Sequence, residues 1–261
     1  FCNVDIDCVV QSEDLPSIYE APVRMQDQGL DTAILKKMNQ PIGEKPALGP
    51  WKSFLELRRK ATKEVHIGLV GKYDLQDAYK SIRESLYQAG TYNNYKTVLT
   101  FINSEKLTKE NVAEKLAGQD GIIICPGFGQ RGIEGKIIAA HYTRTHDIPT
   151  FGICLGMQMM VIEFARNVLG YEDANSREMD EKTEHNVIDI MEEQKNITNM
   201  GGTMRLGAYE CVLKQKSRVL DIYKQEYIQE RHRHRYEFNN EYQKEYERAG
   251  MACVGKNPES D

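Results

Sequence analysis

Residues 148–170 read IPTFGICLGMQMMVIEFARNVLG and join a short strand, a cysteine between two glycines and a helix. The first six residues are mostly apolar, as expected of a buried strand. The residues after Cys154 are rich in methionine and other helix formers, and Gly170 ends the run. A buried strand that turns directly into a helix is the repeating unit of parallel α/β sheets.

The same alternation of strand and helix extends on the N-terminal side as far as Glu64. Short apolar runs predict strands, and apolar residues at helical spacing predict helices, one of them with Thr108 as its N-cap. The expected elements are strands at 64–73, 96–103, 120–127 and 148–154, and helices at 75–93, 108–119, 133–147 and 155–170. This pattern indicates a parallel sheet covered by helices on both faces. Sites in such sheets lie beyond the carboxyl ends of the strands, so we expect a site in the loops after Cys125 and Ile153.

The two ends of the chain differ in character from this region. Before residue 64, the sequence predicts a short strand at Cys8–Gln11, short helices within 21–39, a linker rich in proline and glycine at 40–50, and an amphipathic helix at 51–62. After residue 200, it predicts a glycine pair and a strand within 201–214, a helix at 217–225, a strand followed by a helix within 228–250, and a strand within 251–261.

The composition is that of an ordinary globular protein. Of the 261 residues, 40% are apolar and 28% are charged, and the formal net charge is −5. This acidic balance argues against a nucleic-acid or anionic-membrane binder, and the apolar runs are far shorter than the roughly 20 residues of a membrane helix. The six cysteines form no CxxC pair, which fits free thiols in a cytoplasmic protein better than a disulfide framework. The histidines show no zinc spacing, so no metal ligand is predicted.

Cys154 has the sequence context of a nucleophile. Gly152 and Gly156 lie two residues to either side of it, as in a nucleophile elbow, where a tight turn imposes strained dihedral angles on the nucleophile. The helix N-terminus would favour a thiolate, and the Leu155 N–H would point at an oxyanion. A cysteine that only packs in the core is the alternative, because cysteine is among the most buried residue types. The two glycines around Cys154, taken alone, leave both interpretations open.

A second glycine-rich loop, CPGFGQRGIEG at 125–135, follows the strand that precedes the one ending at Cys154. Its glycines allow backbone N–H groups to face a ligand, and the two loops would be adjacent if their strands pair. An ordinary glycine-rich turn is the alternative. Lys72 follows the first strand, but GLVGKY lacks the second glycine and the Ser or Thr of a Walker loop, so we reject a P-loop there.

Four motifs in order carry a resemblance to a known family. GICLGMQ at 152–158, PGFGQRGIEGK at 126–136, GGTMRLG at 201–207 and RHRHRYEFNN at 231–240 resemble the glutaminase domain of the CTP synthases, a class I, triad-type glutamine amidotransferase. FCNV and EDLPSIYEAP near the start resemble the end of that family's synthetase domain and the interdomain linker. The resemblance implies a flavodoxin-like, doubly wound parallel sheet. It also implies three regions: 1–20 as the synthetase tail, 21–63 as the linker and its helix, and 64–261 as a glutaminase domain that lacks its C-terminal end.

The resemblance implies a catalytic role for three residues. Cys154 would attack the side-chain amide of glutamine, form a thioester and release ammonia. The N–H groups of Leu155 and Gly127 would hold the oxyanion. Each of these roles is carried over from the family's motifs to the matching position of this sequence.

A larger set of residues would bind glutamine. The resemblance implies that Gln158 contacts the substrate, that Glu178 reads its α-amino group, and that Arg235 closes on the same end of the substrate, largely through its backbone. Without the resemblance, Glu178 reads as a solvated loop charge and Arg235 as part of a basic surface strand. The implied substrate-binding set is Gly127, Leu155, Gly156, Met157, Gln158, Glu178, Arg235 and Tyr236.

The resemblance also implies partners for the whole enzyme. The family makes CTP from UTP, ATP and glutamine in pyrimidine biosynthesis, and the glutaminase half passes ammonia to the synthetase half. ATP and Mg²⁺ would bind the synthetase domain, no cofactor would bind this one, and the full enzyme would be a homotetramer. GTP activates the family, and Arg131 and Glu134 are candidate contacts for it in the lid loops at 128–135 and 201–207.

Two features depart from the family pattern. Where the family has Pro-Gly-Gly-Phe-Gly, this chain has Cys125-Pro126-Gly127-Phe128-Gly129, so one potential oxyanion donor is lost because proline has no N–H. In addition, no His-x-Glu occurs in the chain, and we expect the family's base and its orienting acid after Asp261. The chain as given would then be inactive, because the members of a triad act as a unit. The alternative function is a non-catalytic module that binds glutamine or serves in assembly.

Overall fold

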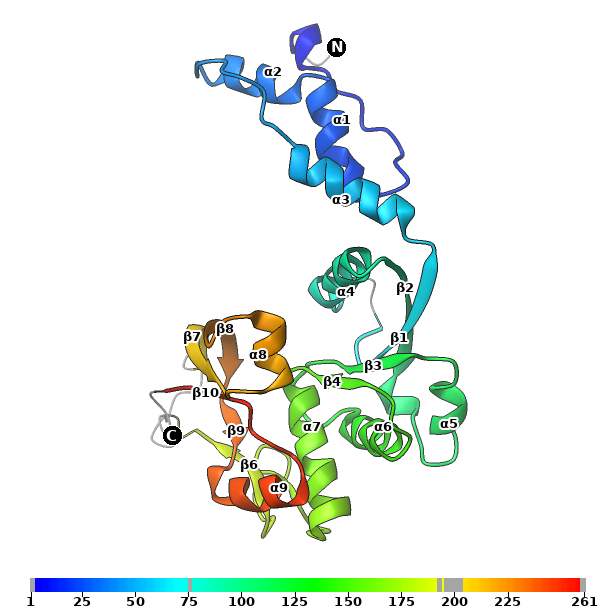
Figure 1. The fold of residues 1–261 in the computed structure, drawn as a ribbon, viewed down its shortest axis with the longest axis vertical. Coiled ribbons are helices and arrows are strands. Elements are labelled where there is room, and N and C mark those ends of the chain that lie inside the picture. Colours follow the sequence, from blue (N-terminus) through cyan, green and yellow to red (C-terminus); the bar gives the residue numbers. More distant parts are fainter. Residues whose placement is uncertain (1–2, 75–76, 192–193, 195–203, 259–261) are drawn as a thin grey trace. The chain divides into compact units, whose positions relative to one another are not determined.

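The structure is a computed structural model that describes residues 3–74, 77–191, 194 and 204–258 (Figure 1). Contacts divide the chain into two compact units, residues 1–65 with 81–98 and residues 66–80 with 99–261. The domain boundaries expected at residues 20 and 63 stay predictions. Among the described residues, no helix combines the length and the apolar character needed to cross a bilayer.

The first unit is helical and contains a cluster of aromatic side chains. Its elements are η1 (Ile6–Cys8), η2 (Ile18–Glu20), α1 (Ala21–Asp27), α2 (Leu30–Lys37), α3 (Gly49–Lys60) and most of α4 (Lys80–Tyr92). The Tyr19 ring packs against Trp51 and Phe54, and Phe54 also contacts Tyr92. The Tyr19 hydroxyl donates to Glu84. These contacts join η2, α3 and α4. The helices α1 and α2 confirm the short helices predicted within 21–39, and α3 confirms the predicted amphipathic helix.

The second unit contains the predicted parallel sheet. Strands β1 (Lys63–Gly71), β2 (Tyr95–Asn103), β3 (Gly121–Ile124) and β4 (Thr150–Gly152) lie in the order β2-β1-β3-β4. β3 pairs in parallel with β1 on one side and with β4 on the other. This order matches the first four strands of the flavodoxin-like arrangement 2-1-3-4-5, so the predicted fold class is confirmed. The carboxyl ends of β3 and β4 are neighbours, and the two loops singled out in the sequence follow them.

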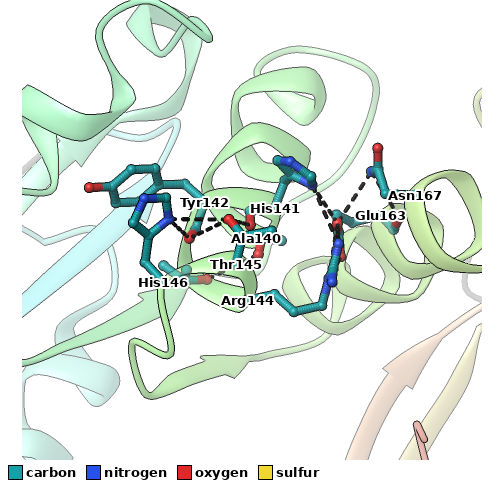
Figure 2. A network of polar contacts seen from close by, with 9 residues as sticks. Ala140, His141, Tyr142, Arg144, Thr145, His146, Glu163 and Asn167 are labelled. Atoms are coloured by element: carbon teal, nitrogen blue, oxygen red, sulfur yellow. Dashed lines mark hydrogen bonds and ion pairs between the residues drawn. The ribbon is translucent and has the colours of Figure 1, made fainter. Parts of the chain in front are cut away.

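Two helices pack side by side next to this sheet, α6 (Ile133–Thr145) and α7 (Leu155–Phe164). The Glu163 carboxylate of α7 is buried and accepts hydrogen bonds from Arg144 of α6, at 2.8 Å from Nη2, and from Asn167, and it contacts the His141 ring at 2.9 Å (Figure 2). A buried carboxylate is stable only with such partners, so the cluster fixes α6 against α7. The π-helical turn η4 (Ala165–Leu169) extends α7, and Gly170 ends it at φ 84°, as predicted.

The rest of the second unit forms two smaller sheets. One contains β5 (Asn175–Ser176), β6 (Asn186–Ile190) and β9 (Tyr236–Phe238), and the other contains β7 (Arg205–Leu213), β8 (Tyr227–His234) and β10 (Gly255–Lys256). The remaining elements are η3 (Ser104–Lys106), α5 (Val112–Lys115), α8 (Arg218–Tyr223), η6 (Asn240–Tyr242) and α9 (Gln243–Ala249). The strands predicted within 201–214, 228–250 and 251–261 and the helix predicted at 217–225 are thus present. The glycine pair of 201–202 lies outside the described residues.

Two local predictions are wrong. Cys8–Gln11 is not a strand: the 3₁₀ turn η1 includes Cys8, and no described strand pairs with the segment, in which Val9 is exposed. Thr108 is not an N-cap, because α5 begins only at Val112. Instead, the Thr108 N–H donates to the Asn111 side chain, at 3.0 Å, and this turn delays the helix.

Candidate active site

Cys154 lies at the junction of β4 and α7 in a strained turn. It is the N-cap residue of α7 and has φ 54° and ψ −114°, a combination that residues with a side chain rarely adopt. The turn passes so close to its neighbours that a Cβ at Gly156 would lie 1.9 Å from the Ile124 carbonyl oxygen, and a Cβ at Gly152 would lie 2.6 Å from the Met157 nitrogen. Both flanking glycines are therefore required by backbone contacts, as a nucleophile elbow demands.

The glycine-rich loop after β3 is held by side chains from elsewhere in the fold. The Lys136 ammonium donates to the Cys125 carbonyl, at 2.6 Å, and the Lys72 ammonium donates to the Phe128 carbonyl and, at 3.0 Å, to the Gly129 carbonyl. Both lysine residues are buried, at 0% and 3% exposure. Gly127 lies between these contacts, and a Cβ there would meet Lys72 Cε at 2.8 Å.

The cysteine turn and the glycine-rich loop share a cavity of about 240 Å³. Six residues predicted from the sequence to act at one site line it together, although they come from distant parts of the chain. The lining residues are Gly127, Phe128, Cys154, Gln158, Glu178, Met204, Arg233, His234, Arg235 and Tyr236. The tertiary fold thus brings five of the eight residues predicted to bind glutamine into one cavity with Cys154.

The Cys154 thiol has a raised pKa, contrary to the thiolate expected from its position at a helix N-terminus. Burial is the main cause, and the Glu178 carboxylate adds to it. The Leu155 N–H and the positive charges of Lys136 and Arg233 oppose the shift but do not cancel it. Cys154 is therefore a thiol near neutral pH, and a reaction at its sulfur needs a base to remove the proton.

Hydrogen bonds position several of the polar residues that line the cavity. The Gln158 amide nitrogen donates to the Tyr236 carbonyl at 3.1 Å, which ties α7 to β9. The Arg235 guanidinium donates to Gln194 at 2.9 Å, and the Arg235 carbonyl accepts from the Met191 N–H at 3.0 Å. Burial raises the pKa of the Tyr236 phenol, with a further contribution from Glu178. Hydrogen bonds thus hold Gln158, Arg235 and Tyr236 in place in the lining of the cavity.

The other predicted residues are not part of the described lining of the cavity. Leu155 is buried in the core and Met157 is 40% exposed, so these residues, like Gly156, could act at the site only through backbone groups. Arg131 pairs with Glu105, at 2.7 Å, and Glu134 pairs with Arg166, at 3.3 Å. The structure therefore does not bring the two candidate GTP contacts into the cavity.

Several lining residues were missed in the sequence. The Arg233 guanidinium lies over the Phe128 ring, 5.0 Å from its centre, and so joins β8 to the glycine-rich loop. His234 contacts His232 through their Nδ1 atoms, 3.1 Å apart, and burial lowers the pKa of both rings. The alternation in HRHR signals a strand with two faces, but only the fold shows that Arg233 and His234 reach the cavity.

One grouping of possible metal ligands occurs among the described residues, and it lies far along the chain from the cavity. It consists of Asp5, Asp7 and Cys8. Lys37 and Lys36 already pair with the two carboxylates, at 2.6 Å and 3.0 Å.

Comparison with known proteins finds a matching family and similar sequences. The family model for class I glutamine amidotransferases matches residues 74–261. The CTP synthase of Bacteroides thetaiotaomicron is 71% identical over 263 aligned residues, and that of Porphyromonas gingivalis is 56% identical over 261. Each alignment covers all of this chain but 49% and 48% of the relative. The chain therefore spans about half the length of the curated relatives it matches.

A solved structure is also similar. The glutaminase domain of the Trypanosoma brucei CTP synthase, solved with bound acivicin, has a TM-score of 0.68 and 38% sequence identity. The similarity covers 73% of this chain and 74% of that one.

Proposed function

The chain belongs to the class I glutamine amidotransferase family, and from this premise we propose that it hydrolyses glutamine at Cys154 to supply ammonia for the amination of UTP to CTP. One observation carries the proposal: Cys154, in its strained turn, shares one cavity with Gly127, Gln158 and Glu178. The 50–71% identity to proteins named CTP synthase supports the choice of reaction.

In the proposed reaction, the Cys154 sulfur adds to the side-chain carbonyl carbon of glutamine, and the thiol proton passes to a base. The oxyanion is held by the N–H groups of Leu155 and Gly127. The C–N bond then breaks, ammonia leaves with a proton from the base, and water hydrolyses the thioester to glutamate. Because the pKa of Cys154 is raised, the base is essential. The family takes it from a His-x-Glu element.

Glutamine would lie between the cysteine turn and the wall formed by β9 and the segment after β5. Glu178 would pair with the substrate ammonium group, and Gln158, Arg235 and Tyr236 would complete the pocket. A carboxylate that pairs with the ammonium group of the substrate selects an α-amino acid over a simple amide. The cavity is smaller than typical drug-sized sites, as expected for one amino acid.

The proposal extends to the wider assembly of a CTP synthase. In this proposal a synthetase domain of the same protein binds ATP, Mg²⁺ and UTP and receives the ammonia, in a cytoplasmic homotetramer. GTP would activate hydrolysis, and Arg131 and Glu134 would have to leave their present ion pairs to contact it.

The test uses the full-length gene product. Cys154→Ala should abolish glutamine-dependent CTP synthesis, by more than about 10³-fold, because the nucleophile is lost. Ammonia-dependent synthesis should stay within twofold, since free ammonia bypasses the cavity. Glutamine-like electrophiles should label Cys154 in the unmodified protein.

A cysteine outside the cavity provides the matched control. Cys253→Ala removes a half-buried thiol that does not line the cavity and that donates a hydrogen bond to the Gly255 carbonyl, and it should leave both activities unchanged. Glutamine-dependent synthesis that survives in Cys154→Ala would refute the proposal.

The raised pKa of Cys154 favours a second candidate, a module that binds glutamine without turning it over. Binding of glutamine by the full-length protein, without release of ammonia, would establish this alternative.

A further inference from the structure

Two buried lysines contact the carbonyl oxygens along the glycine-rich loop. Lys136 lies 2.6 Å from the Cys125 oxygen and 3.5 Å from the Pro126 oxygen. Lys72 contacts the oxygens of Phe128 and Gly129. The described hydrogen bonds of both ammonium groups go to these four carbonyls. Burial of a cation is costly, so contacts of this kind point to a role for the lysines in holding the loop.

These contacts determine where the loop's N–H groups point. The described chain has no cis peptide bond, so the C=O and N–H of each peptide unit face in opposite directions. The Pro126 carbonyl and the Gly127 N–H belong to one peptide unit. Neither Lys72 nor Lys136 lines the cavity that Gly127 lines. With the Pro126 carbonyl turned toward buried Lys136, the Gly127 N–H points away from that lysine, and Gly127 itself lines the cavity.

Both lysines are themselves fixed by the fold. Lys136 lies on α6. The Glu163 cluster ties α6 to α7, the helix that begins after Cys154 (Figure 2). The Lys72 N–H donates to the Tyr79 hydroxyl at 3.2 Å, and this hydroxyl lies 3.5 Å from the Pro126 oxygen. Burial raises the pKa of Tyr79 to about 12, so its hydroxyl stays a donor to that carbonyl.

We propose that Lys136 and Lys72 are positioning residues that clamp the loop so that the Gly127 N–H is aimed at the oxyanion formed on the substrate of Cys154. Neither lysine touches the substrate, and both act through the backbone of the loop. The inference rests on the proposed hydrolysis of glutamine and adds a reason for two buried cations beside a thiol. It also explains how the loop can function with proline at position 126, since one N–H held in place replaces the donor that proline lacks.

Three variants of the full-length protein test the clamp. Lys136→Met and Lys72→Met keep the length of the side chain and remove the ammonium group. Lys115→Met is the matched control, because Lys115 is half exposed and pairs only with its neighbour Glu114 among the described residues. Four quantities are measured: kcat for glutamine, KM for glutamine, the rate of ammonia-dependent synthesis, and the rate of alkylation of Cys154 by iodoacetamide across pH.

The two clamp variants should lower the glutamine-dependent kcat by about 10- to 100-fold, because removal of an oxyanion donor outright costs about 10²–10³. KM for glutamine should change by less than about threefold, since the clamp acts on the transition state. Alkylation forms no oxyanion, so its limiting rate at high pH should stay within about twofold. Ammonia-dependent synthesis should also persist, which shows that the variants fold.

Two outcomes would overturn the inference while leaving the proposed function intact. One is a normal kcat in both clamp variants. The other is a fall in kcat that merely follows the fraction of Cys154 thiolate found by alkylation, which would make Lys136 a charge partner of the thiol and not a clamp. Failure of the proposed function itself would appear separately, as glutamine-dependent activity that survives in Cys154→Ala.

Discussion

The cysteine turn and the glycine-rich loop follow neighbouring parallel strands and line the same cavity, yet they are held in different ways. The turn is held by its own backbone: α7 approaches β3 so closely that position 156 has no room for a Cβ. The loop is held at a distance, by lysine side chains from α6 and from the end of β1. Close contact between backbones fixes the first, and lysine side chains from other elements fix the second.

This difference concerns how precisely each group is placed. A nucleophile must stay within a fraction of an ångström of its working position, and close-packed backbone provides that rigidity. A loop that must admit and release substrate tolerates flexible side chains as its supports. The following changes test the contrast, from the largest expected effect to the smallest.

Gly156→Ala should have the largest effect. The new Cβ would lie 1.9 Å from the Ile124 carbonyl oxygen, and neither backbone can yield without separating α7 from β3. We expect a loss of about 4 kcal/mol in the free energy of unfolding of the second unit, measured by denaturant titration.

A glycine in open space provides the control for this change. A Cβ at Gly43 meets no atom within 4 Å, so Gly43→Ala should change stability by less than about 0.5 kcal/mol. Equal stability of the Gly156→Ala protein and the unmodified protein would mean that the turn is not held by backbone contact.

Lys136 should make stability depend on pH, with an effect of intermediate size. Burial lowers its pKa from 10.5 to about 8, while nearby Cys125 and Cys154 oppose and Lys72 adds to the shift. Between about pH 8 and pH 10.5 the folded protein therefore binds fewer protons than the unfolded one, and the Lys136 contribution to stability rises with pH by about 3 kcal/mol.

The difference in unfolding free energy between the unmodified protein and Lys136→Met isolates this contribution. The subtraction is needed because Tyr79 and Cys125, whose pKa values are both raised to about 12, act in the opposite direction at high pH. A difference that is flat from pH 7 to pH 10 would show that the ammonium group is not buried.

Gly127→Ala should have the smallest effect on stability. Its Cβ would meet the Cε atom of Lys72 at 2.8 Å, and a flexible side chain can move away. We expect a loss of about 1 kcal/mol in stability but a fall of about tenfold in the glutamine-dependent kcat, because the displaced lysine releases the loop.

A double-mutant cycle with Lys72→Met checks the cause. If Gly127→Ala acts by displacing Lys72, its effect on kcat should shrink in the Lys72→Met background. Full additivity of the two changes would contradict this account of the loop.

Most of the α/β region could be predicted from the sequence, because its strands are apolar and the apolar residues of its helices recur at helical spacing. β3 and α6 illustrate this, since each appears within two or three residues of its expected bounds. The strand expected at Cys8–Gln11 failed because a strand depends on a partner that sequence does not reveal. The helix expected from Thr108 shortened because an Asn111 side chain competed for the local backbone.

The sequence by itself determined the cysteine turn. Its glycines, its strand and its helix are contiguous, and the steric demand at Gly152 comes from Gly156 and Met157, a few residues away. The demand at Gly156 comes from Ile124 of β3 and arises only in the folded sheet. Only the tertiary structure decided the pKa of Cys154, because the direction of that shift depends on burial. It also decided the proposed roles of Lys72 and Lys136. In the sequence, Lys72 belongs to no P-loop and Lys136 has no distinct signal. Both act on a loop that lies 57 positions away in the chain for Lys72 and 11 for Lys136, and such contacts exist only once the strands have paired.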